Sequence, residues 1–162
     1  MMGVRKQLEV VAALLNEETT LSLATTGECC KACVAPLFYI VDDDLSLYWL
    51  SSESSLHSMN LAGNPRAAAT VYRSVESWKK IRGVQLRGIV SKVSVPERRD
   101  ALLAAYCKRF KLGRVLLPVL RLSAMYALQP DYIRYIDNAR GFGYKFELTR
   151  RPEGWNLTRA TA

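Results

Sequence analysis

The sequence predicts a mainly β protein in which six or more antiparallel strands close into a small barrel, with helices at its ends and in one crossover. Short segments of alternating apolar and polar residues follow one another, joined by tight turns such as those at Gly27 and Asp42–Asp44. Strands do not alternate with helices, which argues against a doubly wound parallel sheet. We expect residues 1–150 to form one domain and the polar residues 151–162 to form a loose tail.

The first half of the chain reads as one helix followed by strands. Apolar residues recur on one face of residues 4–18, as in an amphipathic helix. Pro36 lies inside an apolar strand, so we expect a bulge or a sheet edge there, because proline has no N–H group to donate. A short helix is expected after a Ser-rich loop, at about residues 54–61. The expected strands are 19–26, 32–41, 45–50 and 66–73.

The second half begins with a long alternating strand, residues 81–93, and a helix that starts at Pro96. Residues 112–122 stay ambiguous, because Pro118 interrupts what would otherwise be a second helix. The last expected strands are 124–128, 132–137 and 144–148.

The chain carries a net charge of +8 and has a pI of about 9.5. Its basic residues are dispersed, and no zinc-finger spacing or RNP-type strand accompanies them, which argues against sequence-directed nucleic-acid binding. A phosphorylated cofactor needs only a few of these cations. No apolar run approaches the roughly 20 residues of a membrane-spanning helix, so no membrane partner is expected. Glu9, Glu17 and Glu18 near the start argue against a secretory signal, and we expect a cytoplasmic location.

Three of the four cysteines cluster after the Gly27 turn. Cys30 and Cys33 have C-x-x-C spacing, with Cys29 beside them and Cys107 far away. A structural zinc site needs four ligands in matched pairs, and the sequence has no second C-x-x-C, so we expect no metal. Reduced thiols on a hairpin strand are the favoured interpretation, and a chemical role is the alternative.

A Ser-rich loop joins the apolar strand 45–50 to the following helix. Free N–H groups in a first helical turn, together with hydroxyl donors, suit a phosphate group. His57 falls within that turn, where its ring can donate to an anion. The alternative is an ordinary capped helix with an exposed histidine. The serines of the loop are Ser51, Ser52, Ser54, Ser55 and Ser58.

Several motifs occur together in a familiar order. They are Ala35-Pro-Leu-Phe-Tyr39, Leu50-Ser-Ser52, Ser55-Leu-His57, Asn64-Pro-Arg66 and Arg82-Gly-Val-Gln-Leu-Arg-Gly88. With them, residues 18–95 resemble the pyridoxamine 5'-phosphate oxidase-like, FMN-binding split-barrel family. Residues 133–144 are similar to the C-terminal strand region of uncharacterised members.

The resemblance implies a six-stranded antiparallel Greek-key split barrel that forms a homodimer, with two FMN molecules at the subunit interface. The apolar strands and residues 112–122 are candidate interface surfaces. His57 and Leu56 stand where family oxidases have lysine and arginine, so lysines and an arginine further along the chain are assigned to the phosphate charge as well. The implied FMN-binding residues are Pro36, Leu37, Phe38 and Tyr39 along the flavin, Leu50, Ser51 and Ser52 at its edge, and Ser55, His57, Lys79, Lys80 and Arg82 at the phosphate.

The function that follows is an FMN flavoprotein, an oxidoreductase that passes electrons between a reduced nicotinamide and a small-molecule acceptor. The family's true oxidases hold pyridoxal phosphate with an Arg-x-His element near the C-terminus, and this chain has no histidine after His57. Pyridoxamine phosphate oxidation is therefore disfavoured. The alternative is a non-catalytic protein that binds flavin, deazaflavin or haem. No catalytic residue is assigned.

Overall fold

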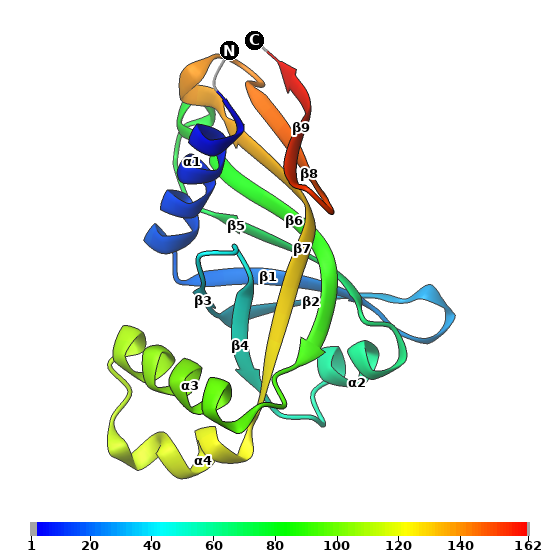
Figure 1. Ribbon diagram of the computed structural model, residues 1–162, viewed down its shortest axis with the longest axis vertical. Coiled ribbons are helices and arrows are strands. Elements are labelled where there is room, and N and C mark those ends of the chain that lie inside the picture. Colours follow the sequence, from blue (N-terminus) through cyan, green and yellow to red (C-terminus); the bar gives the residue numbers. More distant parts are fainter. Residues whose placement is uncertain (1–2, 162) are drawn as a thin grey trace.

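A curled antiparallel sheet forms the body of the computed structural model, which describes residues 3–161 (Figure 1). The predicted mainly β split barrel is confirmed. The helices of this range are α1 (Val4–Glu17), α2 (Leu56–Gly63), α3 (Pro96–Phe110) and α4 (Leu117–Leu122). The strands are β1 (Thr20–Thr26), β2 (Ala32–Phe38), β3 (Ile40–Val41), β4 (Leu47–Ser51), β5 (Arg66–Tyr72), β6 (Arg82–Lys92), β7 (Ala124–Asp137), β8 (Lys145–Arg151) and β9 (Gly154–Thr161). Short 3-10 turns are η1 (Glu28–Cys30), η2 (Trp78–Lys80), η3 (Arg114–Leu116) and η4 (Asn138–Arg140).

Strand β7 is the strand along which the sheet divides. The sheet order is β2-β1-β5-β6-β7-β4-β3, and the β8–β9 hairpin branches from β7. The first residues of β7, 124–128, pair with β4, whereas residues 132–136 pair with β8. Strand β6 follows β7 along its whole length on the other side. Two half-sheets therefore diverge from one shared strand pair.

A proline and a glycine mark the point of division. Pro130 cannot donate to a ladder, and the β6–β7 register shifts between Arg87 and Gly88, opposite it. A Cβ atom at Gly88 would lie 2.0 Å from the carbonyl oxygen of Gln129, so only glycine fits at this crossing. The sequence suggested two strands here, 124–128 and 132–137. The structure has one, because β6 supports β7 across the Pro130 bend.

The core fills the inside of the curled sheet, and α1 covers one end of it (Figure 1). Trp49 and Leu47 of β4 point into this core, whereas Tyr48 points outward beneath α3. Strand β4 is thus buried on both faces, which explains its almost continuous apolar sequence. The helix α3 covers the outer face through Leu103 and Tyr106.

One expectation is corrected near the end of the chain. Residues 151–162 are not a loose tail in the part that is described, because Gly154–Thr161 form β9, paired with β8. Leu157 alternates inward along β9 and packs with Trp155 against the core, a pattern hidden among polar residues. Residues 3–161 contain nine strands, in keeping with the six or more that the sequence predicted; the family resemblance implied six. The ambiguous residues 112–122 contain η3 and α4, since Pro118 stands in the first turn of α4.

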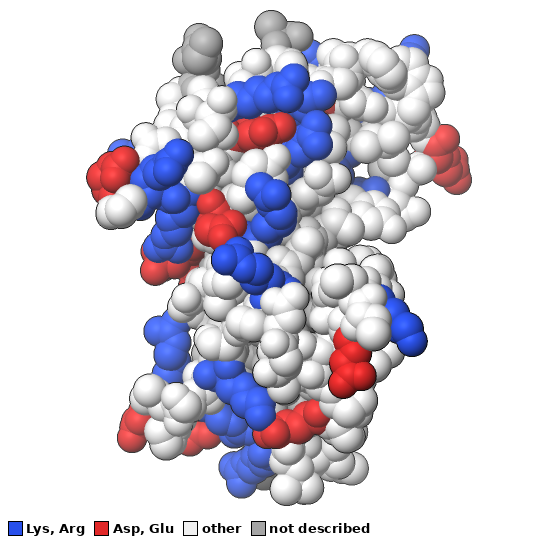
Figure 2. Space-filling view, turned by 90° about the vertical axis from the view of Figure 1, so that its right-hand side faces the viewer, with Lys and Arg blue, Asp and Glu red and all other residues white. Residues whose placement is uncertain are grey.

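Basic side chains form a broken band down the face shown in Figure 2, with a few acidic ones between them.

Edge strand β2 carries Pro36 opposite Ser22 and pairs with β1 alone, as the proline predicted. Within residues 3–161, none of the helices has the length and apolar character that crossing a membrane requires.

Candidate functional site

Strand β4 ends beside the start of α2, and the loop between them folds back on itself. Ser51 is the last residue of β4, and Ser55 caps α2 by accepting a hydrogen bond from the Ser58 amide. His57 Nε2 lies 2.7 Å from Ser51 Oγ and 3.1 Å from Ser55 Oγ. The two hydroxyl oxygens are 3.2 Å apart. These three residues, Ser51, Ser55 and His57, form what we call the serine–histidine cluster.

The cluster has the donors that an oxygen-rich anion needs. A helix leaves its first amides without an intrahelical partner, and those of Leu56 and His57 lie in the first turn of α2. Two hydroxyls and an imidazole stand beside them. The plain-cap interpretation is correct for Ser55, but His57 is half-buried and hydrogen-bonded rather than exposed. Ser52 lies outside the cluster, exposed, with its hydroxyl 2.8 Å from that of Ser54.

Burial lowers the pKa of His57 from its ordinary value. The unfolded chain therefore binds a proton at this residue more readily than the folded chain does. The free energy of unfolding should fall as the pH drops through about 6.5, the ordinary histidine pKa, and should recover above it. Urea unfolding at several pH values, compared between the wild-type protein and His57→Gln, isolates this contribution. A difference that stays constant with pH would contradict the assignment.

Strand β2 presents most of the predicted flavin-lining residues, but not all of them. Pro36 and Phe38 are exposed on one face, and Leu37 packs against the core from the other. Tyr39 does not line any surface: it is fully buried, and its hydroxyl donates to the Leu15 carbonyl at 2.6 Å. The assignment of the Tyr39 side chain to the flavin is therefore wrong, because this ring closes the core against α1. Leu50 is half-buried beneath α3.

The predicted cationic residues lie far from the cluster within one chain. Arg82 pairs with Asp137 at one end of β7, whereas Ser51 pairs with Ala124 at the other. The two positions are thirteen residue steps apart on β7, a path along the strand of roughly 40 Å at about 3.3 Å per residue. Arg82 forms an ion pair with Glu17, and η2 holds Lys79 and Lys80 exposed at the same end. A single chain does not gather all twelve predicted residues around one ligand.

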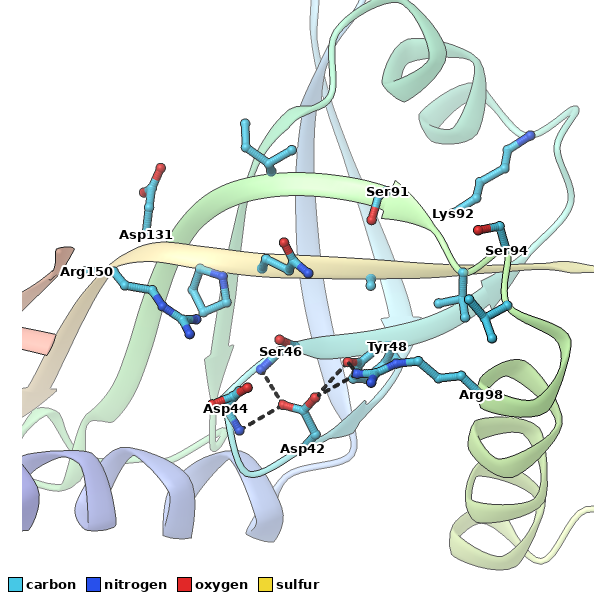
Figure 3. A pocket seen from close by; sticks show the side chains of 16 residues that line it. Asp42, Asp44, Ser46, Tyr48, Ser91, Lys92, Ser94, Arg98, Asp131 and Arg150 are labelled. Carbon is cyan, nitrogen blue, oxygen red and sulfur yellow. Dashed lines mark hydrogen bonds and ion pairs between the residues drawn. The ribbon is translucent and has the colours of Figure 1, made fainter. Parts of the chain in front are cut away.

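A polar pocket that the sequence did not predict opens on the outer face of the sheet beside α3, with a volume of about 620 Å³ (Figure 3). Asp42 Oδ1 accepts hydrogen bonds from the amides of Asp44 and Ser46, and its Oδ2 accepts from Tyr48 at 2.7 Å. Arg98 reaches this pair from α3. Burial, and then the hydrogen bond to Asp42, raises the pKa of Tyr48. The Asp42–Asp44 sequence signalled only a turn, and nothing local links it to Arg98.

A second hollow, of about 750 Å³, lies between α2 and the β1–β2 hairpin. Leu56, which stands between Ser55 and His57, lines it together with Cys33 and Asn60. Asn60 donates to Thr25 on β1 and so ties the helix to the hairpin. The structure places Cys33 in β2, whereas Cys29 and Cys30 lie in the η1 turn rather than in a strand, and all are free thiols. Across the described range, their surroundings offer no set of three or more potential metal ligands.

Comparison with solved structures defines the class of this fold as a split barrel of the pyridoxamine 5'-phosphate oxidase-like type. A pyridoxamine 5'-phosphate oxidase-related, FMN-binding protein from Nostoc punctiforme superposes with a TM-score of 0.70 at 11% identity, covering 100% of this chain and 98% of its own. HutZ, a haem storage protein from Vibrio cholerae, superposes with a TM-score of 0.64 at 19% identity, covering 75% and 88%. At such identities the likeness shows the fold alone.

Sequence comparison gives the family. Residues 8–137 match the model of the pyridoxamine 5'-phosphate oxidase family, and the chain belongs to it. A UPF0306 protein from Klebsiella pneumoniae is 32% identical over 117 residues, which is 72% of this chain and 76% of that protein.

Proposed function

We propose that the protein binds FMN and passes electrons between a reduced nicotinamide and a small-molecule acceptor. The serine–histidine cluster is the observation that carries this proposal. It joins two hydroxyls and an imidazole within hydrogen-bonding reach of one another, beside the first turn of α2 and at a strand end where a phosphate can be held. The FMN-binding neighbour supports the same choice of cofactor.

The residues present fit the cofactor. Ser51, Ser55 and His57 would hold its phosphate, and the hollow lined by Leu56 lies directly against the same helix turn. That hollow falls in the size range of small-molecule sites, about 300–1,000 Å³. The exposed face of β2 carries the apolar side chains of Pro36 and Phe38, and the Phe38 ring lies 4.9 Å from that of Phe110, centroid to centroid. Bound FMN supplies the redox chemistry, taking electrons as a hydride or singly.

The chain's own residues would position the cofactor and keep water away from the strands that it contacts. Half-buried Leu50 and Leu37 keep water from the core side of β2 and β4. His57, with its pKa lowered by burial, is neutral near pH 7 and can take up a proton when a dianionic phosphate approaches. Pyridoxamine phosphate oxidation is not proposed, because the chain offers no histidine after His57 for the family's substrate element.

We propose that the protein is a homodimer whose second chain brings Lys79, Lys80 and Arg82 to the flavin. Within one chain these cations lie at the opposite end of β7 from the cluster, so a second copy is the simplest way to unite them. Strand β2 supports this, because it is a sheet edge with apolar, exposed side chains; Val34 is 66% exposed. Light scattering should give about twice 18.2 kDa at micromolar concentration. A mass of one chain would contradict the proposal.

Haem is the second candidate, because HutZ shares the fold. His57 is the sole histidine and its Nε2 already contacts Ser51 and Ser55, so it would have to leave both to ligate iron. This geometry favours flavin over haem.

The absorbance spectrum of the purified protein, followed by titration with FMN, deazaflavin and haem, tests the proposal. We expect FMN to bind and NADH or NADPH to bleach its visible band. A protein that binds haem as a sharp Soret species and leaves FMN free would overturn it. A protein that binds FMN without reduction by either nicotinamide would retain the cofactor and exclude the proposed donor.

A further inference from the structure

Turn η3 and helix α4 form an exposed apolar tip at the lower end of the molecule in Figure 1. Val115 and Leu122 are 90% and 89% exposed, and Val119 is 62% exposed. Leu116 is also exposed. Single exposed apolar side chains are ordinary, but four within eight residues make a patch that calls for a partner. We call these four residues the apolar tip.

The apolar tip lies in the middle of an acid-free stretch of the chain. Residues 101–130 contain no aspartate or glutamate and five basic residues. Of the five, Arg109 is committed to the fold, since it donates to the carbonyl oxygens of Asn16 and Glu18. The side chains of Lys108, Lys111 and Arg121 are exposed beside the tip. Exposed Asp100 lies just before this stretch, with its Oδ1 4.0 Å from Arg99 Nη1. The surface here is thus apolar at its centre, with three exposed cations and this one carboxylate around it.

The fold holds the tip in place. Arg99 of α3 donates to the carbonyl oxygens of Arg121 at 2.8 Å and Ser123 at 2.9 Å, and so ties down the end of α4. At the other end, the Leu112 amide donates to the Cys107 carbonyl and closes α3. Leu120, on the inner side of α4, packs against the apolar cluster of Tyr48, Leu103 and Tyr106 on the outer face of the sheet. The exposed side chains therefore point away from a fixed base.

We propose that the apolar tip docks on the surface of membranes that contain anionic phospholipids. Apolar side chains that enter the headgroup boundary, ringed by cations that meet lipid phosphates, are the two components of interfacial binding. A tip-to-tip contact between two copies is a poor alternative, because it would set Lys108, Lys111 and Arg121 against the same cations across the twofold axis. The sequence also made residues 112–122 a candidate dimer interface, and the mass of a tip variant separates that arrangement from membrane docking. The sequence prediction of no membrane partner rested on the lack of a spanning helix, which surface docking does not need.

Sedimentation of the full-length protein with vesicles tests the proposal. We expect binding to phosphatidylcholine vesicles that contain one-third phosphatidylglycerol, weaker binding to pure phosphatidylcholine, and release by added salt. Leu122→Asp should lower the partition coefficient at least about tenfold, because it puts a carboxylate into the contact. Replacing Lys108, Lys111 and Arg121 by glutamine should weaken binding to anionic vesicles and abolish its salt dependence.

Phe142→Asp is the matched control. Phe142 is 85% exposed and lies between η4 and β8, at the opposite end of the molecule from α4. This variant makes the same change of charge and should bind vesicles within about twofold of the wild type. Equal binding to neutral and anionic vesicles, or equal loss in both variants, would overturn the proposal. So would a Leu122→Asp variant that halves the mass in light scattering and binds vesicles like the wild type, since the tip would then join two copies.

Discussion

Replacing Ser55 and His57 together by alanine is expected to weaken FMN binding about a hundredfold while leaving riboflavin binding nearly unchanged. Hydrogen bonds to a charged group contribute about 1.5–3 kcal/mol each. Two such bonds at the lower figure give about 3 kcal/mol, which is about a hundredfold in affinity. Riboflavin lacks the phosphate, so its binding should reflect only the loss of the Ser55 helix cap. Fluorescence titration of both ligands measures the ratio.

Ser54→Ala provides the control, because Ser54 lies in the same loop but its hydroxyl contacts Ser52 instead of the cluster. Loss of the Ser55 cap will also destabilise α2 by about 1 kcal/mol, and this part should affect both ligands alike. Replacing Lys79, Lys80 and Arg82 should add a loss that fades at high salt. If FMN and riboflavin lose affinity equally, the loop is a helix cap and no more.

Substituting Gly88 by alanine is expected to destabilise the fold by about 3 kcal/mol, at the upper end of overpacking effects. The added Cβ would meet the carbonyl oxygen of Gln129 at 2.0 Å and the carbonyl carbon at 2.8 Å. Backbone atoms cannot rotate away as a side chain can, so the two strands must separate at this crossing. Thermal unfolding should show the midpoint lowered by about 10 °C.

Gly113→Ala is the companion variant, because a Cβ at Gly113 would meet nothing within 4 Å. It should change stability by less than about 1 kcal/mol in either direction. Similar midpoints for the two variants would show that β6 and β7 accommodate a methyl group at Gly88 without loss of stability.

The sequence correctly predicted those strands and helices that are determined by their own residues, through hydrophobic periodicity or a proline. Residues 4–18 gave the amphipathic α1, and Pro36 correctly marked an edge strand. The sequence pattern failed where a strand forms or continues only because a neighbouring strand pairs with it. Strand β7 continues through Pro130 because β6 supports it, and β9 forms from a polar sequence because β8 offers an edge and Leu157 finds the core. Neither partner is visible from the segment alone.

The candidate site, too, was predictable where its contacts are local in the sequence and unpredictable where they are not. The meeting of a strand end, hydroxyls and a helix start between Ser51 and His57 is local, and the sequence predicted it. Tyr39 was assigned to the flavin by its neighbours in the chain, yet its hydroxyl reaches Leu15, twenty-four residues away. The Asp42–Tyr48–Arg98 network joins residues up to 56 positions apart, so no short motif marks it in the sequence. Contacts of that range come only from the three-dimensional arrangement.

The shared strand β7 has a consequence for the order in which the protein folds. Leu50 pairs with Met125, seventy-five residues later, so closing the barrel depends on contacts of high sequence separation, which slow folding. The β1–β2 hairpin can pair as soon as it is synthesised, but β4 has no neighbour except the two-residue β3 until β7 leaves the ribosome. Until then Trp49 and Leu47 have no closed interior to enter. The nascent chain therefore passes through a stage with an unpaired strand edge and exposed apolar side chains. At that stage aggregation competes with folding, and binding by a chaperone should have its largest effect.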